Sequence, residues 1–305
     1  MLSINKVKSS PLEKDSVNVA TVSDYIELLK PRVMSLAIFT AIIGLLLAPG
    51  SLHPVLSLFA IIAIGAGAGA AGAINMWYDR DIDAIMDRTK FRPIPSGRVS
   101  SDEALSLGVV LTIFSVLLLS IASNYIAAFF LLLSILFYVF IYTVWLKRTT
   151  PQNIVIGGAA GALPPVIGWY VISSDFSIFP IILFLIIFLW TPPHFWALSL
   201  YRSGDYEKAS IPMLPVIKGN DFTKLNIFLY SISLIFITPS LWYLNLLGLI
   251  YGVSSIILSL IFIYYAWNVY KGIQGSEPKL FKFSIIYLFL IFLIMPIDKY
   301  FGMVF

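Results

Sequence analysis

The amino-acid sequence predicts an all-α polytopic membrane protein whose nine transmembrane helices surround a central cavity, with the N-terminus in the cytoplasm. The first observation is composition, since 59% of the 305 residues are hydrophobic and only 12% are charged. A soluble domain has about 25% charged residues. The second observation is a series of nine apolar runs, each close to the roughly 20 residues that a helix needs to cross a bilayer. The third is the distribution of positive charge between these runs.

The nine runs are predicted to be helices because only helices and closed barrels satisfy backbone hydrogen bonds in hydrocarbon, and these runs do not alternate as barrel strands do. They cover residues 32–49, 54–77, 103–122, 125–146, 153–173, 178–200, 222–243, 246–270 and 281–302. The connections after the second and sixth runs, 78–102 and 201–221, are long. Function is therefore expected at the end of the bundle where these connections lie.

Lysine and arginine residues fall on one side of this predicted bundle. The connections near 50–53, 123–124, 174–177 and 244–245 contain none. The opposite side holds Lys6, Lys8, Lys14, Lys30, Arg32, Arg80, Arg88, Lys90, Arg92, Arg98, Lys147, Arg148, Arg202, Lys208, Lys218, Lys224, Lys271, Lys279 and Lys282. By the positive-inside rule this side is cytoplasmic, and nine spans then place the C-terminus with Lys299 outside.

The first residues of the chain bear on its location. The tail, residues 1–24, has no apolar segment typical of a secretory signal peptide, and it carries Glu13 and Asp15 but no arginine, unlike a mitochondrial transit peptide. These features favour a bacterial plasma membrane, with residues 25–305 as one membrane domain. The chain has no cysteine, which excludes disulfides, thiolate nucleophiles and cysteine metal sites.

The stretch NMWYDRDIDAIMDRT places several carboxylates directly after an apolar run. Asn75, Asp79 and Asp83 are spaced so that on a helix they drift by about 40° and rise by about 6 Å per step. They therefore form one polar stripe, which Asp87 continues, while Asp81 points elsewhere. Oxygen ligands without His or Cys suit a hard cation such as Mg²⁺. The alternative interpretation is a solvated loop whose charges pair with one another.

Basic residues accompany the acids in both long connections. Guanidinium groups bind phosphate oxygens in bidentate fashion, and three arginines follow the first acidic stretch: Arg88, Arg92 and Arg98. In the second connection Asp205 lies between Arg202 and Lys208. If the two connections face each other, Asp205 can bind a second metal ion, and otherwise it is a charge partner for Lys208. Acids beside cations at a membrane surface point to a metal–diphosphate site.

Four segments resemble the signatures of UbiA-type intramembrane prenyltransferases, and the resemblance covers about residues 25–300. They are KPRVMSL at 30–36, NMWYDRDIDAIMDRTKFRPIPSG at 75–97, YTVWLKRTTPQNIVIGGAAGALPPVIGW at 142–169 and DYEKASIPMLP at 205–215. Within the superfamily, the DxxMDRTxxRP continuation looks like the branch that farnesylates haem. The chain departs from the wider superfamily at Ala209, where many members have a second aspartate, so metal coordination in the second connection rests on Asp205 alone.

The resemblance implies a reaction and its participants. A farnesyl group passes from farnesyl diphosphate to a vinyl group of haem b, with addition of water, to give haem O and diphosphate, and a haem A synthase is a candidate partner. Mg²⁺ is expected as Lewis acid and template on Asn75, Asp79, Asp83 and Asp205. Basic residues are expected to neutralise the diphosphate oxygens, namely Arg88, Arg92, Lys147, Arg148, Arg202 and Lys208.

Three further candidates have two interpretations each. Tyr142 either stabilises the allylic cation through its ring face, as the resemblance implies, or belongs to an interfacial aromatic belt. His194, in WTPPHFW, either contacts haem or hydrogen-bonds backbone groups freed by the preceding prolines. Arg32, with Lys30, either reaches a phosphate or haem propionate or anchors the first span.

Other functions stay open at this point. One is prenylation of a quinone precursor or another aromatic acceptor by the same chemistry. Another is a cation-coupled transporter with the aspartates as ion ligands, although transporter sites lie near the midplane and these acids lie at helix ends among arginines. A haem-binding scaffold without catalysis explains His194 but leaves the acidic stripe unexplained.

Overall fold

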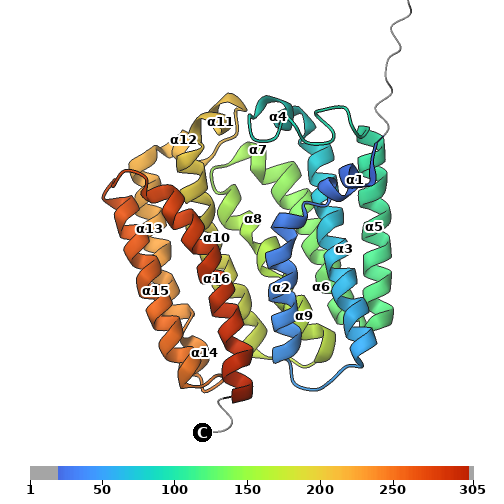
Figure 1. Ribbon diagram of the computed structural model, residues 1–305, viewed down its shortest axis with the longest axis vertical. Helices are drawn as coiled ribbons and strands as arrows, with labels where there is room; N and C mark the ends of the chain where they lie inside the picture. Colours follow the sequence, from blue (N-terminus) through green and yellow to red (C-terminus); the bar gives the residue numbers. More distant parts are fainter. Residues whose placement is uncertain (1–19, 302–305) are drawn as a thin grey trace, which may run out of the picture.

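The protein is helical throughout residues 20–301, the part of the chain that this computed structural model describes (Figure 1). The elements are α1 (Val22–Leu28), α2 (Pro31–Leu47), α3 (Pro54–Tyr78), α4 (Arg80–Ile85), α5 (Ser101–Ala122), α6 (Tyr125–Leu136), the π-helix η1 (Phe137–Leu146), α7 (Lys147–Thr149), α8 (Asn153–Ala162), α9 (Pro164–Ile172), α10 (Ile178–Tyr201), α11 (Ser203–Lys208), α12 (Leu214–Lys218), α13 (Asn220–Ile237), α14 (Ser240–Tyr243), α15 (Leu249–Tyr270) and α16 (Ser276–Phe301).

The predicted spans are confirmed. Within residues 20–301, eight helices are long and apolar enough to cross a membrane, and the count is nine when α1 and α2, which bend by 58° at their junction, are one span. The last span begins at Ser276 rather than at 281, because its first turns carry Lys279 and Lys282 and are polar although helical. Of the predicted tail, residues 1–19 lie outside the described part of the chain, and α1 begins at Val22.

Two spans change their helical geometry partway along. The fifth is broken between α8 and α9 at Leu163, because Pro164 and Pro165 have no N–H groups to continue the backbone hydrogen bonds. The fourth starts as α6 and continues as the π-helix η1 up to Leu146. π-Helical turns are rare and occur frequently at functional sites.

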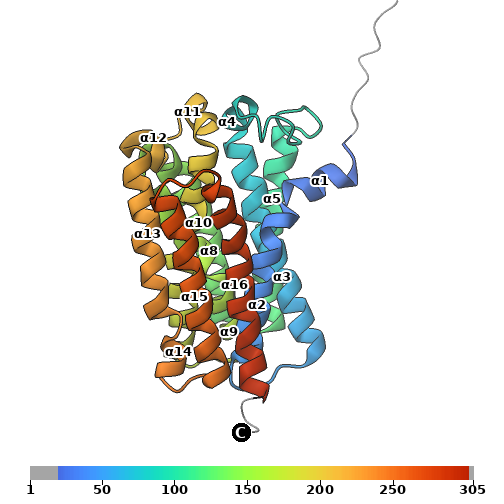
Figure 2. The same ribbon diagram turned by 60° about the vertical axis from the view of Figure 1, so that its left-hand side comes forward.

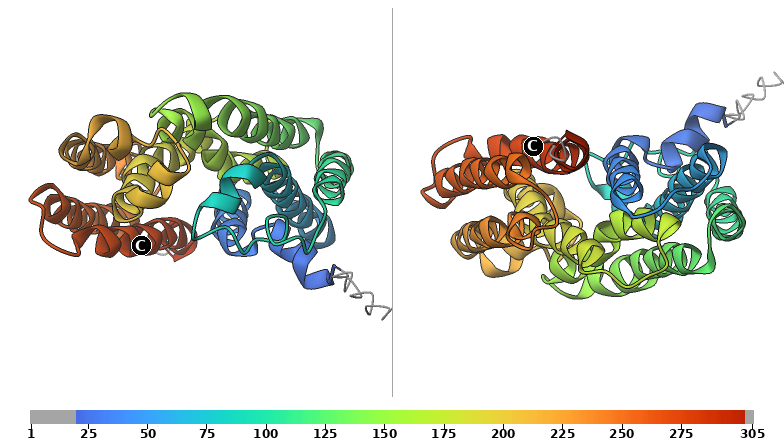
Figure 3. Two further views of the ribbon diagram at one scale, coloured as in Figure 1. Left: turned by 90° about the horizontal axis from the view of Figure 1, so that it is seen from above. Right: turned by 90° about the horizontal axis from the view of Figure 1, so that it is seen from below.

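Close helix contacts hold the bundle together. Helix α2 packs along α9, where a Cβ added at Gly168 would lie 1.9 Å from the Ala41 carbonyl oxygen and one at Gly44 would lie 2.1 Å from that of Pro165. Only glycine permits backbones to approach this closely. Helix α16 also packs against α2, so the first and last spans are neighbours (Figure 3).

The two long connections lie at the same end of the bundle. Helices α4, α11 and α12 cap this end, and α14 and the last turn of α16 lie at the opposite end (Figures 1 and 2). The chain thus brings together the two acidic segments, which are more than a hundred residues apart in sequence. The name "polar end" is used below for the end that carries α4, α11 and α12.

Candidate active site

A row of three polar side chains crosses the junction of α3 and α4. Helix α3 ends at Tyr78, but the backbone N–H of Asp79 still donates to Asn75 over 2.9 Å and that of Asp83 donates to Asp79 over 2.8 Å. The helical register therefore continues through the break, and Asn75, Asp79 and Asp83 are all buried, with Asp79 fully inaccessible. We call these residues the acidic row.

The row is shorter than the sequence pattern predicts. Asp87 does not continue it, because α4 ends at Ile85 and Met86 has extended backbone angles. Asp87 is exposed and pairs with Lys90 at 2.7 Å. Asp81 points away from the row and is exposed, as expected.

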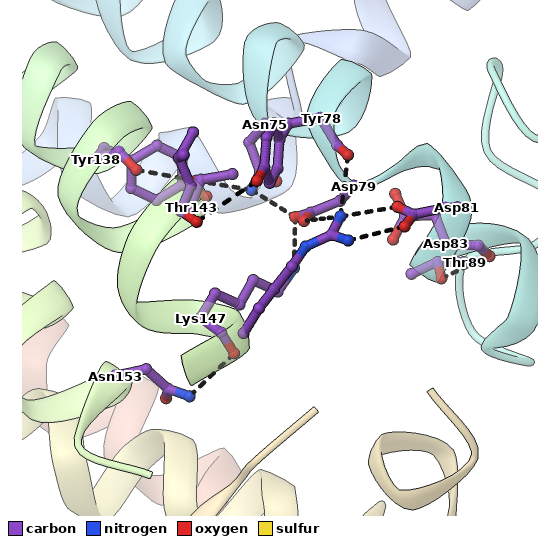
Figure 4. A network of polar contacts seen from close by, with 12 residues as sticks. Asn75, Tyr78, Asp79, Asp81, Asp83, Thr89, Tyr138, Thr143, Lys147 and Asn153 are labelled. Atoms are coloured by element: carbon purple, nitrogen blue, oxygen red, sulfur yellow. Dashed lines mark hydrogen bonds and ion pairs between the residues drawn. The ribbon is translucent and has the colours of Figure 1, made fainter. Parts of the chain in front are cut away.

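Each carboxylate of the row lies against a cationic side chain, and Figure 4 shows Lys147 beside Asp79. Lys147, at the end of the fourth span, pairs with Asp79, and Arg92 lies 2.7 Å from Asp83. Lys30 donates to the amide oxygen of Asn75. Such pairing is required because an ionised group buried without a partner costs several kcal/mol, in the range of about 3–5 kcal/mol.

Lys30 reaches Asn75 from the bend between α1 and α2. Its backbone is left-handed, with φ 54° and ψ 54°. This conformation is uncommon outside glycine and costs about 1–3 kcal/mol, so it persists only where surrounding contacts impose it. The bend, which sequence reasoning did not find, therefore aims the lysine at the row.

Arg148 bridges the row and the exposed Asp81. Its guanidinium makes two hydrogen bonds of 2.8 Å to Asp81, lies 3.6 Å from Asp79 Oδ1 and covers the ring of Tyr78 at 4.8 Å. The hydrogen bonds from Arg148 hold the pKa of the Asp81 carboxyl below its usual value. The planar guanidinium is thereby fixed beside the acidic row rather than free in solvent.

The second long connection approaches the row from α11. Asp205 is half-buried, and Tyr206 beside it is buried, which raises the pKa of the Tyr206 hydroxyl even though the positive charge of Arg88 acts in the opposite direction. Lys208 pairs with Asp87 at 3.4 Å and not with Asp205. The two long connections therefore meet, as the metal–diphosphate hypothesis requires.

The donor atoms fit a hard cation, although in residues 20–301 no three His, Cys, Asp or Glu side chains form a ready metal site. The side chains of Lys147, Arg92 and Lys30 lie against the oxygen atoms that were expected to bind the metal. Two buried carboxylate oxygens, Asp79 Oδ1 and Asp205 Oδ2, nevertheless have no hydrogen-bond partner among the described residues. Buried acceptors without donors are rare. An all-oxygen donor set of this kind matches Mg²⁺.

Two tyrosines of η1 lie next to the row on its membrane side. The rings of Tyr138 and Tyr142 are 5.3 Å apart. Tyr142 packs so closely on α8 that a Cβ at Gly157 would lie 2.2 Å from its Cδ2 atom. Tyr142 is thus half-buried and packed against α8, and its role at the site or in an interfacial belt stays a prediction.

The remaining predicted residues have different surroundings. The ring of His194 is stacked between Trp190 and Phe281, with centroids 4.3 and 4.7 Å away, and its Nδ1 lies 2.6 Å from Ser284 Oγ. Its hydrogen bond thus goes to a side chain of α16 and not to backbone freed by the prolines. Arg32 is exposed.

Two arginines of the polar end have partners outside the row. Arg202 is exposed and covers the ring of Tyr201 at 4.9 Å. Arg98 pairs with Asp24 and with Glu27, the latter at 3.0 Å, so it ties the first long connection to α1 instead of facing the row.

Sequence reasoning missed three polar side chains at the site, of which Thr143 and Asn153 are buried. Thr143 accepts a 3.0 Å hydrogen bond from the Asn75 amide, Tyr138 lies beside it, and Asn153 donates to the Lys147 carbonyl over 3.4 Å (Figure 4). A threonine and a tyrosine inside an apolar run look like ordinary span residues. The available signal for the threonine was its place just before Lys147 and Arg148 in the quoted segment YTVWLKR, whereas Tyr138 lies before that segment.

Known proteins match the chain over nearly its whole length. A protoheme IX farnesyltransferase of Afipia carboxidovorans is 54% identical over 299 residues, which are 96% of this chain and 95% of that protein. A protoheme IX farnesyltransferase of Granulibacter bethesdensis is 50% identical over 305 residues, or 97% of this chain and 96% of that protein.

Solved structures share the fold. A structure of digeranylgeranylglyceryl phosphate synthase has a TM-score of 0.74 at 22% identity and covers 90% of this chain and 98% of its own. A UbiA homolog from Archaeoglobus fulgidus, bound to DMAPP and Mg²⁺, has a TM-score of 0.65 at 17% identity, covering 88% and 99%. The model of the UbiA prenyltransferase family matches residues 37–293. This polytopic membrane protein therefore belongs to the UbiA prenyltransferase family.

Proposed function

We propose that this protein transfers the farnesyl group of farnesyl diphosphate to protohaem IX. Relatives that are about half identical to it over almost the full chain are named protoheme IX farnesyltransferase, a name that gives the acceptor and the transferred group. The observation that carries the proposal is the buried acidic row, flanked by lysine and arginine and adjoined by the second long connection at one end of an apolar bundle. Such a site suits a diphosphate whose hydrocarbon tail lies among the spans.

The oxygen donors of the row are the residues that would hold Mg²⁺, namely Asn75, Asp79 and Asp83, with Asp205 from the second connection. When bound, the metal supplies Lewis acidity to the departing diphosphate. The support from this structure is the two buried carboxylate oxygens, one on Asp79 and one on Asp205, that have no hydrogen-bond partner among the described residues. Support from outside it is the Archaeoglobus homolog that was solved with Mg²⁺ and a prenyl diphosphate.

The basic residues bind and orient the diphosphate. Lys147, Arg148 and Arg92 already lie against the row, and Arg88, Arg202 and Lys208 extend the positive charge over the polar end. Positioned cations of this kind stabilise the charge that develops on the leaving group. Lys147 and Arg92 are held by buried carboxylates before substrate arrives, so these two cations need little reorganisation at the moment of reaction.

The chemical step breaks the bond between farnesyl C1 and the diphosphate oxygen, and the electron pair leaves with diphosphate. The vinyl group of haem attacks C1 to form a carbon–carbon bond. Water adds to the resulting cation and loses a proton, which gives the hydroxyethylfarnesyl group of haem O. Tyr142 presents its ring beside the site and stabilises the allylic cation, and the surrounding apolar side chains exclude water until the new bond has formed.

The remaining parts of the proposal concern the acceptor and the location. Haem lies in the apolar chamber between the spans, with His194 and Arg32 as its candidate contacts, and a haem A synthase takes the product. The domain comprises residues 25–305, the membrane is the bacterial plasma membrane, and the polar end faces the cytoplasm, consistent with the positive charge gathered there.

Incubation of membranes that contain the protein with haem b and farnesyl diphosphate tests the proposal, with mass spectrometry of the extracted haems as the readout. We expect a farnesylated haem only when both substrates and Mg²⁺ are present. A parallel incubation with a quinone precursor measures the main alternative acceptor. Prenylation of that acceptor without any haem product would refute the haem assignment while keeping the enzyme class.

A further inference from the structure

The π-helix η1 gives one threonine an unusual pair of hydrogen bonds. The hydroxyl of Thr143 donates to the carbonyl of Tyr138, five residues earlier, over 2.9 Å. A threonine in an α-helix bonds to a carbonyl three or four residues earlier. The hydroxyl hydrogen is therefore committed to the backbone of its own span, and the oxygen of Thr143 can act towards α3 only as an acceptor.

The amide of Asn75 fits this acceptor. Its nitrogen donates one hydrogen to Thr143 Oγ1 over 3.0 Å and the other to Asp79 Oδ2 over 2.7 Å. Both N–H groups are thus used, and the amide oxygen is left to face Lys30. Figure 4 shows Asn75 between Thr143 and Asp79.

The contacts on both sides of the Asn75 amide disfavour the orientation in which its oxygen and nitrogen are exchanged. It would place the Asn75 oxygen against the Asp79 carboxylate and against an oxygen of Thr143 that has no hydrogen to offer, and it would turn the NH₂ group towards the Lys30 ammonium. An amide has two donors and one acceptor oxygen, and its orientation follows from its partners. Without Thr143, one of the two restraints on the amide is lost and a buried N–H has no acceptor.

We propose that Thr143 is a positioning residue for prenyl-diphosphate binding. It acts by holding the Asn75 amide oxygen on the side of the acidic row that faces Lys30. The inference rests on the proposed function only in taking the row as the diphosphate end of the site. It does not depend on the identity of the acceptor. The π-helix is what makes the arrangement possible, because it brings Thr143 opposite Asn75 while the Tyr138 carbonyl binds the threonine hydrogen.

The test compares Thr143→Val with Thr143→Ser and with a matched control, Thr223→Val. Thr223 is also fully buried and donates to a backbone carbonyl four residues earlier, that of Gly219 just before α13, but no side chain donates to it among the described residues. We expect Thr143→Val to raise the KM for farnesyl diphosphate about 10- to 100-fold, the usual effect of removing a group that orients a binding residue. Thr143→Ser and Thr223→Val are expected to keep the wild-type KM.

A binding measurement separates this proposal from the identity of the acceptor. The rise in unfolding temperature caused by farnesyl thiodiphosphate with Mg²⁺, in the absence of haem, should be large for wild type and Thr143→Ser and small for Thr143→Val. If haem is not the acceptor, this shift is unaffected. A Thr143→Val protein with the full shift would overturn the proposal.

A double-mutant cycle shows whether Thr143 acts through Asn75. In an Asn75→Ala background, Thr143→Val should cause no further loss of the ligand-induced shift, because the amide that it orients is absent. Equal losses in the two backgrounds would mean that Thr143 acts independently of Asn75. A Thr143→Ser variant as impaired as Thr143→Val would assign the effect to the lost methyl group and would also contradict the proposal.

Discussion

Lys208 and Asp87 join the two long connections of the chain, with Lys208 Nζ 3.4 Å from Asp87 Oδ2. The pair shows that α11 lies beside the segment that follows α4, so Asp205 and the acidic row occupy the same end of the bundle. Had the two acidic segments lain at opposite ends, no single metal–diphosphate site could include both.

Loss of this pair is expected to leave stability unchanged. Both side chains are mostly exposed, and exposed ion pairs are screened by water and salt and contribute little. Lys208→Met should therefore unfold at the wild-type temperature, while its KM for farnesyl diphosphate rises modestly because one positive charge near the site is lost. A marked drop in unfolding temperature, measured in detergent at matched salt, would show that the contact between the connections depends on this pair.

Asp79→Asn is expected to abolish turnover. The substitution keeps the side chain's size but removes the charge that faces Lys147 and replaces one carboxylate oxygen with an NH₂ group. Product formation should fall below detection, while the protein is still recovered from membranes as a single species in size-exclusion chromatography. The control is Asp102→Asn, an exposed aspartate in the first turn of α5, which should behave as wild type. Retained activity in Asp79→Asn would refute the role of the row.

Arg148→Lys is expected to lower kcat/KM for farnesyl diphosphate about tenfold or more. A lysine presents a point charge and cannot reproduce the two parallel bonds to Asp81 together with the approach to Asp79. The matched control is Arg98→Lys, which loses a similar double pairing to Asp24 and Glu27 on α1, away from the row. If both variants lose the same fraction of kcat/KM, the effect reports a general requirement for arginine at the polar end.

The membrane spans were predictable because their signal is hydrophobic length, which depends on no distant contact. The row was predictable for Asn75, Asp79 and Asp83 because local helical spacing places them on one side. The prediction extended too far at Asp87, since the sequence gives no sign that α4 ends after Ile85. Helical spacing was therefore sufficient to predict the members of the row only as far as the helix continued.

The partners of the row were less predictable. Lys147 lies 68 residues from Asp79 along the chain, and the pairing of the two side chains depends on how the fourth span packs beside α3. The π-helix η1 carries no proline or glycine that would signal a change in geometry, so neither it nor the acceptor role of Thr143 follows from the pattern. The left-handed backbone at Lys30 is likewise a consequence of tertiary contacts.

Gly157→Ala is expected to reduce turnover by moving Tyr142. The added methyl group would lie 2.2 Å from the Tyr142 ring, so the ring must shift away from α8, whereas the acidic row is untouched. We therefore expect a lower kcat with little change in the KM for farnesyl diphosphate. Gly161→Ala is the matched control, because Gly161 lies one turn further along α8 and has nothing within 4 Å of its added methyl group.

The companion variants Tyr142→Phe and Tyr142→Leu separate the ring from the hydroxyl. If the ring face stabilises the allylic cation, Phe should retain most of the activity and Leu should lose it, because a leucine fills space without offering a π face. Gly157→Ala should then resemble Leu more than Phe in kcat. Full activity of both Gly157→Ala and Tyr142→Leu would contradict a role for the ring and leave Tyr142 as a packing residue of the span.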